Sequence, residues 1–410
     1  MKICGIIAEY NPFHNGHAYQ IQKLREQGIT HIVAVMSSNF VQRGEAAVLD
    51  KYTRAKTAII NGVDLVLELP LPYCASTAQK FAFGGVSVLE KIGCVDYLGF
   101  GCEHDNINDL QVIANFVCTE KSDKALRDSL ASGLPYAMAR NAVVFNYLGA
   151  KYSSLMHMPN NILAIEYLRS MRMLRSKIEP LPVLREGAAH DNIDPVGNFA
   201  SASLIRSAIL ASRFETMTKY LPENVYEIIK NEIAEKRCPA TIFNCERTVL
   251  SKMRALSAED FLKIPDVSEG LEHRIFESVK KSTNIPNLII NIKTKRYTHS
   301  RIRRIVLHSF LGVTRKDFVP IRAARVLAIG ERGAEILSRA KKTSMINIYS
   351  NYSQVSHLTE PAKRLNRIED RAYDLFGLCT PKVQPSNLNK TMKIVTLEER
   401  ENEEENEIII

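Results

Sequence analysis

The sequence predicts an α/β protein whose first two hundred residues build a parallel sheet and whose remainder is mainly helical. Two observations support this prediction. Strand-like and helix-like segments alternate along the first two hundred residues, as right-handed βαβ units require. After about residue 205, apolar positions recur at helical spacing and strand-like runs become rare.

Short apolar runs place the strands. The run Ile3–Ala8 is nearly continuous, which is typical of a strand buried on both faces. A later run ends at Pro70, which cannot continue a sheet ladder. Strands are therefore expected at 3–8, 31–36, 63–69 and about 94–100, with helices at 17–27, 52–61 and 77–91.

The second half of the chain has a different pattern. Helices are expected at 203–235, 247–263, 269–282, 299–311 and 321–341. Residues 285–293 are expected to form one strand or a buried turn, and the last dozen residues an acidic, frayed tail. The predicted regions are 1–210, 211–395 and the tail 396–410.

Composition narrows the class of protein. The chain has 410 residues, 45% hydrophobic and 24% charged, which excludes collagenous, mucin-like and wholly disordered proteins. The formal net charge is +9. Residues 238–390 hold 27 Lys and Arg against 14 Asp and Glu, so the positive charge is concentrated in the C-terminal half. An anionic partner is therefore plausible: a nucleotide, a nucleic acid or a membrane surface.

The eight cysteines are scattered, with no CxxC pair and no Cys/His cluster of zinc spacing. We therefore expect free thiols in a reducing compartment and no metal site. No window approaches the roughly 18–20 apolar residues that a membrane span needs, and no signal peptide is recognised. The expectation is a soluble, cytoplasmic protein.

The strongest local signal is the turn after the first strand, Asn11-Pro12-Phe13-His14-Asn15-Gly16-His17. In an open parallel sheet, ligands bind beyond the carboxyl ends of the strands. The helix that follows offers unpaired N–H groups to an anion, and His14 and His17 add side-chain donors. These features describe a triphosphate cradle. The alternative is a turn histidine and a helix-cap histidine, with Gly16 present for a positive φ.

Longer strings carry a resemblance to a known family. In order they are GIIAEYNPFHNGH, MSSNFVQRGEAAVLDKYTRA, GVDLVLELP, FGCEHDN, MPNNILAIEYL and TKRYTHSRIRR. From residue 1 to about 380 the chain resembles the bacterial tRNA(Met) cytidine acetate ligase family, within the HIGH nucleotidylyltransferase superfamily. Cys102, where a serine is more usual, and MHMPNN before the double Asn depart from the pattern.

The resemblance implies a parallel, doubly wound, Rossmann-like nucleotidylyltransferase domain followed by a basic, mainly helical tRNA-binding region. It implies a ligase that forms a carbon–nitrogen bond. Acetate and ATP would give acetyl-adenylate and pyrophosphate, and the acetyl group would pass to N4 of the wobble cytidine of elongator tRNA(Met), releasing AMP. ATP is then a substrate and Mg²⁺ is expected on its phosphates. Both first-step reactants are anions, so the chemistry needs positioning and cationic stabilisation.

The resemblance also implies the site residues. His14 and His17 are the catalytic pair, suited to that stabilising role. The expected ATP-binding residues are Ile7, Ala8, Glu9, Tyr10, Asn11, Pro12, Phe13, His14, Asn15, Gly16, His17, Gln20, Gly101, Asn160, Arg185, Ser203 and Arg206.

Several of these positions have simpler explanations. Ser201 can be an ordinary N-cap in front of Ser203 and Arg206 rather than part of a phosphate-binding turn. One of Asn160 and Asn161 can likewise be a plain N-cap. The segment 42–45, with Lys51 and Arg54, supplies either further cations or a solvated surface; the sequence leaves both open.

Residues 293–304 hold six Lys and Arg and no acid. Tyr297 gives a stacking surface among the charges, and Ser300 is expected to cap a helix that carries Arg301, Arg304 and Lys316 outward. The expected tRNA-binding residues are Lys293, Lys295, Arg296, Arg301, Arg303 and Arg304. The alternative is a solvated face without a partner.

Two other functions stay open. One is a small-molecule nucleotidyltransferase that moves an adenylyl group to a cofactor precursor, although such enzymes are typically shorter and lack a basic helical region. The other is a non-catalytic RNA-binding protein that retains the cradle. The sequence leaves the oligomeric state undetermined.

Overall fold

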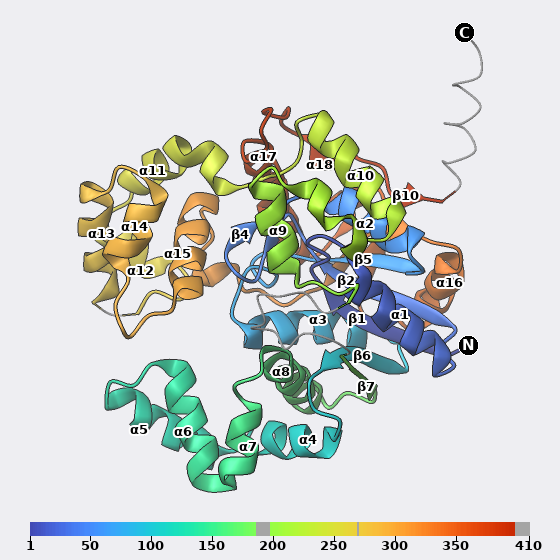
Figure 1. Cartoon of the computed structure of the whole chain (residues 1–410), viewed down its shortest axis with the longest axis horizontal. Helices are drawn as coiled ribbons and strands as arrows, with labels where there is room; N and C mark the ends of the chain where they lie inside the picture. Colours follow the sequence, from blue (N-terminus) through green and yellow to red (C-terminus); the bar gives the residue numbers. More distant parts are fainter. Residues whose placement is uncertain (186–196, 269, 398–410) are drawn as a thin grey trace.

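The computed structural model describes residues 1–185, 197–268 and 270–397. Its centre is an eight-stranded sheet of order β10-β8-β5-β2-β1-β6-β7, with β9 paired to β8 (Figure 1). The strands are β1 (Ile3–Ala8), β2 (His31–Ser37), β5 (Leu65–Leu69), β6 (Tyr97–Cys102), β7 (Glu179–Leu184), β8 (Ala323–Ile329), β9 (Asn347–Tyr349) and β10 (Val395–Thr396). A separate hairpin joins β3 (Phe40–Val41) to β4 (Glu45–Ala46).

Five consecutive strands of the sheet, β5, β2, β1, β6 and β7, are parallel, as the alternating pattern predicts. Their carboxyl ends therefore meet at one edge of the sheet. Strand β8 runs antiparallel to β5. The four predicted strands are confirmed to within a few residues.

Helices cover both faces of the sheet, so the doubly wound α/β class is confirmed (Figure 1). Alternate residues of β1 point to opposite faces. Ile3 and Ile7 share a core with Leu89 of one helix layer, whereas Cys4 and Ile6 share another with Leu24. The first layer contains α3 (Ala78–Ile92) and α8 (Pro159–Leu174); the second contains α1 (Asn15–Glu26), α2 (Lys51–Ile60), α9 (Ala202–Leu210) and α10 (Glu223–Ala234).

Two groups of helices project from this body (Figure 1). The first lobe follows β6 and holds α4 (Ile107–Phe116), α5 (Glu120–Ala131), α6 (Tyr136–Leu148) and α7 (Ala150–Leu155). The second lobe holds α11 (Glu246–Arg254), α12 (Ala258–Lys263), α13 (Leu271–Lys281), α14 (Ile285–Ile292) and α15 (His299–Leu311). The other helices are α16 (Gly333–Thr343), α17 (Glu360–Gly377) and α18 (Leu388–Thr391), with 3₁₀ turns at Phe214–Tyr220, Ile242–Cys245, Arg315–Asp317 and Tyr352–His357.

Two expectations for the second half are wrong. The predicted helix 321–341 is a strand, β8, followed by a shorter helix, α16. The segment AARVLAI pairs with β5, whose other side would otherwise be an open sheet edge. The predicted strand or turn at 285–293 is the helix α14, in which Ile285, Leu288, Ile289 and Ile292 are buried at i, i+3, i+4, i+7 spacing.

Strands β8 and β9 come from the region 211–395, and β10 straddles the predicted boundary between this region and the tail 396–410. All three complete the sheet of the region 1–210. Where a domain boundary lies along the chain stays a prediction. Most of the expected acidic tail, residues 398–410, lies outside the described residues. All eight cysteines are free thiols. In the described part of the chain, no helix combines the length and the apolar character needed to cross a membrane.

Three buried ionisable side chains lie beneath the carboxyl edge of the sheet. The Lys51 ammonium is 2.5 Å from Glu68 and 3.8 Å from Glu369 of α17. Burial and the charge of Glu68 raise the pKa of Glu369 to about 8. Burial alone would raise the pKa of Glu68 as well, but Lys51 holds it below its usual value. One ammonium thus faces one ionised and one largely protonated carboxyl.

This arrangement predicts a large loss of stability for Lys51→Ala. The substitution leaves the buried Glu68 charge unpaired, which lowers the free energy of unfolding by about 3 to 5 kcal/mol. Denaturant titration measures the change. The matched control is Lys230→Ala, which removes an exposed ion pair with Glu227 and is expected to change stability by less than about 1 kcal/mol. Equal effects in the two variants would contradict this prediction.

Candidate functional site

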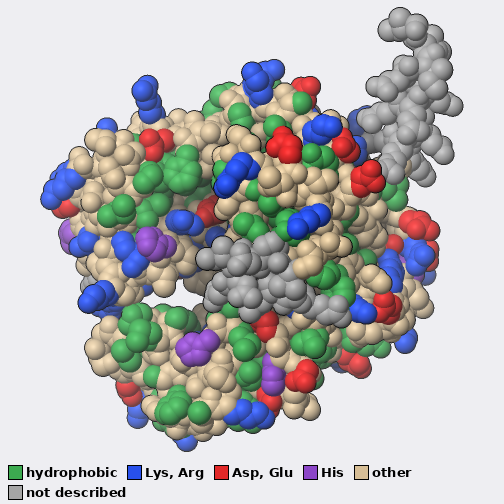
Figure 2. Space-filling model, in the orientation of Figure 1, with side chains coloured by type: hydrophobic (Ala, Val, Ile, Leu, Met, Phe, Trp, Pro, Cys, Tyr) green, Lys and Arg blue, Asp and Glu red, His purple; other side chains and the backbone are tan. Residues whose placement is uncertain are grey.

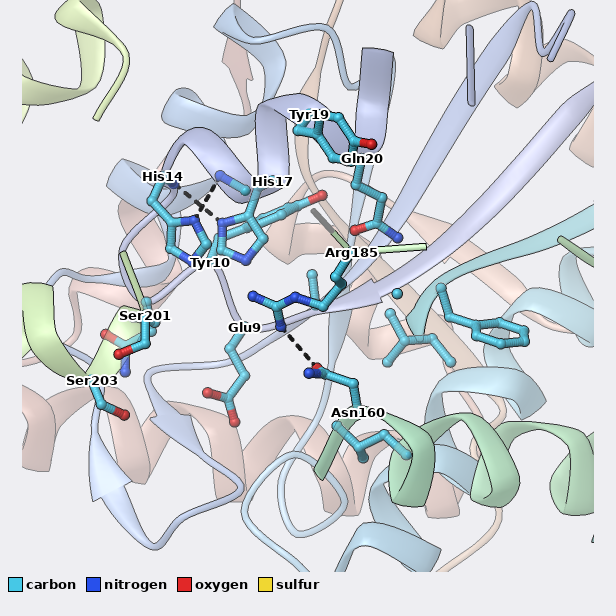
Figure 3. A pocket seen from close by; sticks show the side chains of 18 of the residues that line it. Glu9, Tyr10, His14, His17, Tyr19, Gln20, Asn160, Arg185, Ser201 and Ser203 are labelled. Carbon is cyan, nitrogen blue, oxygen red and sulfur yellow. Dashed lines mark hydrogen bonds between the residues drawn. The ribbon is translucent and has the colours of Figure 1, made fainter. Parts of the chain in front are cut away.

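A cavity of about 270 Å³ opens at the carboxyl edge of the sheet, among the ends of β1, β6 and β7 (Figure 3). Strand β1 contributes Ile7 and Ala8, and β6 contributes Gly101. The first turns of three helices complete the wall: His17 comes from α1, Asn160 from α8 and Ser203 from α9. This is the position at which open parallel sheets bind ligands.

The chain turns sharply between β1 and α1. Tyr10 adopts a left-handed backbone, with φ of 44°, and both Tyr10 and Phe13 are buried. Their rings lie 4.9 Å and 5.4 Å from the ring of His17, measured between centroids. The two buried aromatic side chains therefore fix the orientation of this imidazole.

Two histidines cap the N-terminus of α1. The Gly16 N–H donates to Nδ1 of His14 at 3.0 Å, and the His14 N–H donates to Nδ1 of His17 at 3.2 Å. The two rings are stacked, with centroids 3.8 Å apart. Because both Nδ1 atoms accept, the neutral rings carry their protons on Nε2. Figure 3 shows the rings directed into the cavity, where the two Nε2–H groups are donors.

Both imidazoles are neutral at pH 7. Burial, together with the charges of Arg185 and Arg206, lowers the pKa of His14 to about 3. Burial and the neighbouring His14 lower the pKa of His17 well below its usual value. At neutral pH these rings supply hydrogen-bond donors rather than cationic charge, and the role of His14 and His17 in catalysis stays a prediction. They are neutral donors aimed at an anion site.

Gly16 is needed because it has no side chain and so leaves room for the ring of His14. Its backbone conformation is not unusual. Its φ is an ordinary helical one, so the alternative of a positive-φ turn glycine is wrong. A Cβ at this position would lie 2.9 Å from Cε1 of His14. Any side chain here would displace the ring that caps the helix.

Arginines supply the positive charge of the cavity. Arg206 donates to the Asn11 carbonyl at 2.9 Å and to Oγ of Ser203 at 3.2 Å. Arg43 also donates to this hydroxyl, at 3.0 Å. Burial lowers the pKa of Arg206 from its ordinary value, which is far enough above neutrality that the guanidinium stays charged. Ser203 thus lies between two cations, beside the N-terminus of α9.

A carboxylate holds the N-terminus of α8, which forms one side of the cavity. Glu103 accepts hydrogen bonds from the main-chain N–H of Asn161 at 3.0 Å and from the side chain of Asn160. It therefore caps α8, and the expectation that one of the two asparagines is the N-cap is wrong. Oδ1 of Asn160 then accepts from Arg185 at 3.0 Å (Figure 3).

Comparisons with known proteins agree on one family. A family model described as HIGH Nucleotidyl Transferase matches residues 1–391. The tRNA(Met) cytidine acetate ligase of Thermoanaerobacter sp. (strain X514) is 39% identical over 384 residues, covering 92% of this chain and 94% of that protein. The ligase of Thermosipho africanus is 38% identical over 367 residues, 86% of this chain and 85% of that protein. This chain belongs to the tRNA(Met) cytidine acetate ligase family.

Solved structures of this family have the same fold. Thermotoga maritima TmcAL without ligand matches with a TM-score of 0.92, 32% identity and coverage of 97% of this chain and 100% of that chain. The same protein bound with alpha-thio ATP matches with a TM-score of 0.90, equal identity and equal coverage. The resemblance inferred from the sequence is confirmed.

Most of the residues predicted for ATP line the cavity. They are Ile7, Ala8, Glu9, Tyr10, Asn11, His14, Gly16, His17, Gln20, Gly101, Asn160, Arg185, Ser203 and Arg206. Pro12, Phe13 and Asn15 are absent from the described lining. Phe13 is core, and the Asn15 amide donates to the carbonyls of Asn198 and Lys219, both at 3.0 Å. A ligand contact for any single residue stays a prediction.

The apolar residues that line the cavity were not predicted from the sequence. They are Tyr19, Phe81, Phe100, Leu163, Tyr167, Val183, Leu184 and Phe199. These side chains come from separate elements, and in the sequence each occupies an ordinary core-like position. Lys51 and Arg54 do not reach the cavity: both are fully buried, and Arg54 donates to the carbonyls of Leu49, Glu9 and Ser38.

The basic stretch is only partly exposed. Thr298, not Ser300, caps α15. Arg304 points inward and is paired with Asp266 at 2.7 Å, so its expected outward orientation is wrong. Arg301 lies over the Tyr297 ring and donates to the Asp266 carbonyl at 2.9 Å.

Arg303 forms an ion pair with Glu45, and Lys293 is half-buried. Lys295 and Arg296 are exposed. Figure 2 shows the molecule hollowed between the lobe of α11–α15 and the lobe of α4–α7, with Lys and Arg side chains on the lobe of α11–α15 beside the hollow. Binding of RNA by this stretch stays a prediction.

The cap geometry predicts how the histidines titrate. His14 should stay neutral, protonated on Nε2, from pH 8 down to pH 5, because its pKa is about 3. It gains charge only as the pH falls toward that value. ¹⁵N spectra of protein labelled at histidine, assigned with His14→Gln and His17→Gln, measure the tautomer and the midpoint. A midpoint between pH 6 and 7, or a proton on Nδ1, would contradict the proposed cap.

Proposed function

We propose that this chain activates acetate with ATP as acetyl-adenylate and transfers the acetyl group to N4 of the wobble cytidine of elongator tRNA(Met). The observation that carries the proposal is the pair of neutral Nε2–H donors in an arginine-lined cavity of a member of this ligase family. The enzyme is a ligase, and the bond it forms joins carbon to nitrogen.

The geometry supports a placement for ATP. The imidazoles of His14 and His17, the N-termini of α1 and α9, and the guanidinium of Arg206 converge on one part of the cavity, which suits the phosphates. The apolar and planar groups near Gly101, with Asn160 and Arg185, suit the nucleoside. A related structure carries alpha-thio ATP, which is consistent with this assignment.

The residues of the cavity fit Mg²⁺ only if the ion is coordinated by the phosphates of ATP. Within the ranges that the structure describes, no group of three His, Cys, Asp or Glu side chains is placed to hold a metal ion. Mg²⁺ prefers phosphate oxygens and water as ligands, so phosphate-bound Mg²⁺ would supply charge neutralisation. The protein would supply orientation, because the reaction of two anions needs alignment and cationic donors rather than covalent catalysis.

The test uses labelled acetate. Purified protein is incubated with radiolabelled acetate, ATP and bulk tRNA, and label in the N4-acetylcytidine of digested RNA supports the proposal. Transfer of AMP to a small molecule without labelled RNA would favour a small-molecule nucleotidyltransferase. Binding of RNA without ATP turnover would favour a non-catalytic RNA-binding protein. A cytoplasmic location stays a prediction.

His17→Ala is expected to lower acetyl-adenylate formation by about 100-fold or more, because it removes one cavity donor and the acceptor of the His14 N–H. Binding of tRNA should stay within about 2-fold, since the exposed basic residues lie on another lobe. Hydroxylamine trapping of acetyl-adenylate measures the first quantity. His273→Ala, an exposed histidine on α13, is the control. Retained adenylation in His17→Ala would contradict the assignment.

Lys295→Ala combined with Arg296→Ala is expected to weaken tRNA binding and to reduce the slope of log affinity against log salt by about 1 to 2. These two side chains are exposed, whereas Arg304 is engaged with Asp266 and is not a suitable target. Acetyl-adenylate formation should be unchanged. The matched control is Lys341→Ala with Lys342→Ala, which removes two exposed charges from α16. An equal effect of both double variants would contradict a specific RNA surface at α15.

A further inference from the structure

Glu9 carries the only carboxylate among the described residues that line the cavity. It is the first residue after β1, and its main chain is fixed because the Arg54 guanidinium donates to its carbonyl at 2.6 Å. Oε1 of Glu9 accepts the Gln42 N–H at 3.0 Å. In Figure 3 the side chain stands in the cavity, across from the imidazoles and between Ser203 and Asn160.

This carboxylate is unfavourable for the ligand that the rest of the cavity suits. Arg206, Arg185 and two Nε2–H donors attract a triphosphate, whereas a carboxylate among them repels it. Its charge acts on Arg206, raising the pKa of the guanidinium against the larger effect of burial. A side chain that opposes the binding of ATP and of acetate needs a reason that lies in another step.

The β3–β4 hairpin contacts both Glu9 and α15, the helix that follows the exposed basic residues Lys295 and Arg296. At its tip, Gln42 donates to Glu9 and Arg43 donates to Ser203. On its other side the hairpin packs closely against α15. A Cβ on Gly44 would lie 2.4 Å from the main-chain nitrogen of Arg304, and Glu45 forms an ion pair with Arg303. The hairpin thus lies between α15 and the side of the cavity that holds Glu9.

The second half of the proposed reaction needs a proton acceptor on that side. N4 of cytidine attacks the acetyl carbonyl carbon, and a C–N bond forms. The bond between that carbon and the phosphate oxygen breaks, and AMP leaves with the electron pair. N4 must release one proton, and once it has attacked the carbonyl it is a much stronger acid than a carboxylic acid, so a carboxylate is a sufficient base.

We propose that Glu9 is the general base of acetyl transfer, accepting the N4 proton on the oxygen opposite its bond to Gln42 and passing it to solvent. The inference rests on the proposed function and deepens it. For Glu9 it replaces the expected contact with ATP by a role in the second half-reaction, separate from ATP binding. Adenylation of acetate involves no proton transfer, so the two half-reactions should respond differently to the loss of this carboxylate.

Glu9→Gln is the test, because the amide keeps an oxygen that can accept the Gln42 N–H but is no longer a base. Acetyl-adenylate formation, measured by hydroxylamine trapping, should stay within about 3-fold of the wild type. Single-turnover transfer from preformed, enzyme-bound acetyl-adenylate to tRNA should fall by about 100-fold or more. The rise of the transfer rate with pH at acidic pH should disappear in the variant. Glu227→Gln, an exposed carboxylate on α10, should leave both rates unchanged.

Adenylation also reports folding, since a misfolded cavity cannot form acetyl-adenylate. Glu9→Asp, which keeps a base on a shorter side chain, should retain the pH dependence of transfer. Equal loss of both half-reactions in Glu9→Gln would overturn the inference and assign Glu9 to ATP or Mg²⁺. Transfer at the wild-type rate would also overturn it, while leaving the ligase function intact. Failure of the wild type to label tRNA would instead overturn the proposed function, and the inference with it.

Discussion

The hydrogen bonds that His14 and His17 accept from the main chain decide where the other groups of the cavity can act. Each ring uses Nδ1 to satisfy an N–H group at the start of α1, groups that a helix leaves without partners. The proton of each neutral ring is therefore on Nε2, facing the cavity. The helix cap and the ligand donor are the same side chain, so the position of the donor is as rigid as the helix. Gly16 permits this because a Cβ there would meet the His14 ring.

The strand ends beneath these donors are held by a buried guanidinium and a buried carboxyl group. Arg54 donates to the carbonyls of Glu9 and Ser38, which follow β1 and β2 and have left the sheet ladder. Glu369, from α17, accepts from the Leu71 N–H and from the Ser38 hydroxyl. A helix near the end of the described chain therefore fixes the loop edge at its beginning.

The parts of the fold that could be predicted are those determined by local pattern. The run Ile3–Ala8, the histidine turn and α1 lie within two dozen residues, and each is required by neighbours in the sequence. Some failures are local, such as the helix α14, whose buried residues have helical spacing. Others involve partners far along the chain. Arg304 was expected to be exposed, but Asp266 lies 38 residues earlier and pairs with it.

The same reason applies to β8 and to the apolar wall of the cavity. The segment AARVLAI is compatible with a helix until the open side of β5 is known. Phe81, Phe100 and Tyr167 cannot be told from core residues by their spacing, because they come from α3, β6 and α8 and meet only in the folded protein. Polar motifs identify a site in the sequence more readily than the apolar surfaces that shape it.

The two proposed half-reactions have opposite electrostatic requirements, and different sides of the cavity meet them. The first proposed half-reaction brings together anions, and it is served by guanidinium groups and by imidazole donors that stay neutral. Neutral donors have an advantage here, because they bind phosphate without losing a proton to it or to solvent as pH changes near neutrality. The second half-reaction releases a proton, which a cationic wall would hinder. The carboxylate of Glu9 is held by Gln42 on the side of the cavity nearest α15. It supplies negative charge where the N4 amine is proposed to arrive. One cavity can therefore serve both steps while AMP stays bound, provided that the two polarities stay on separate walls.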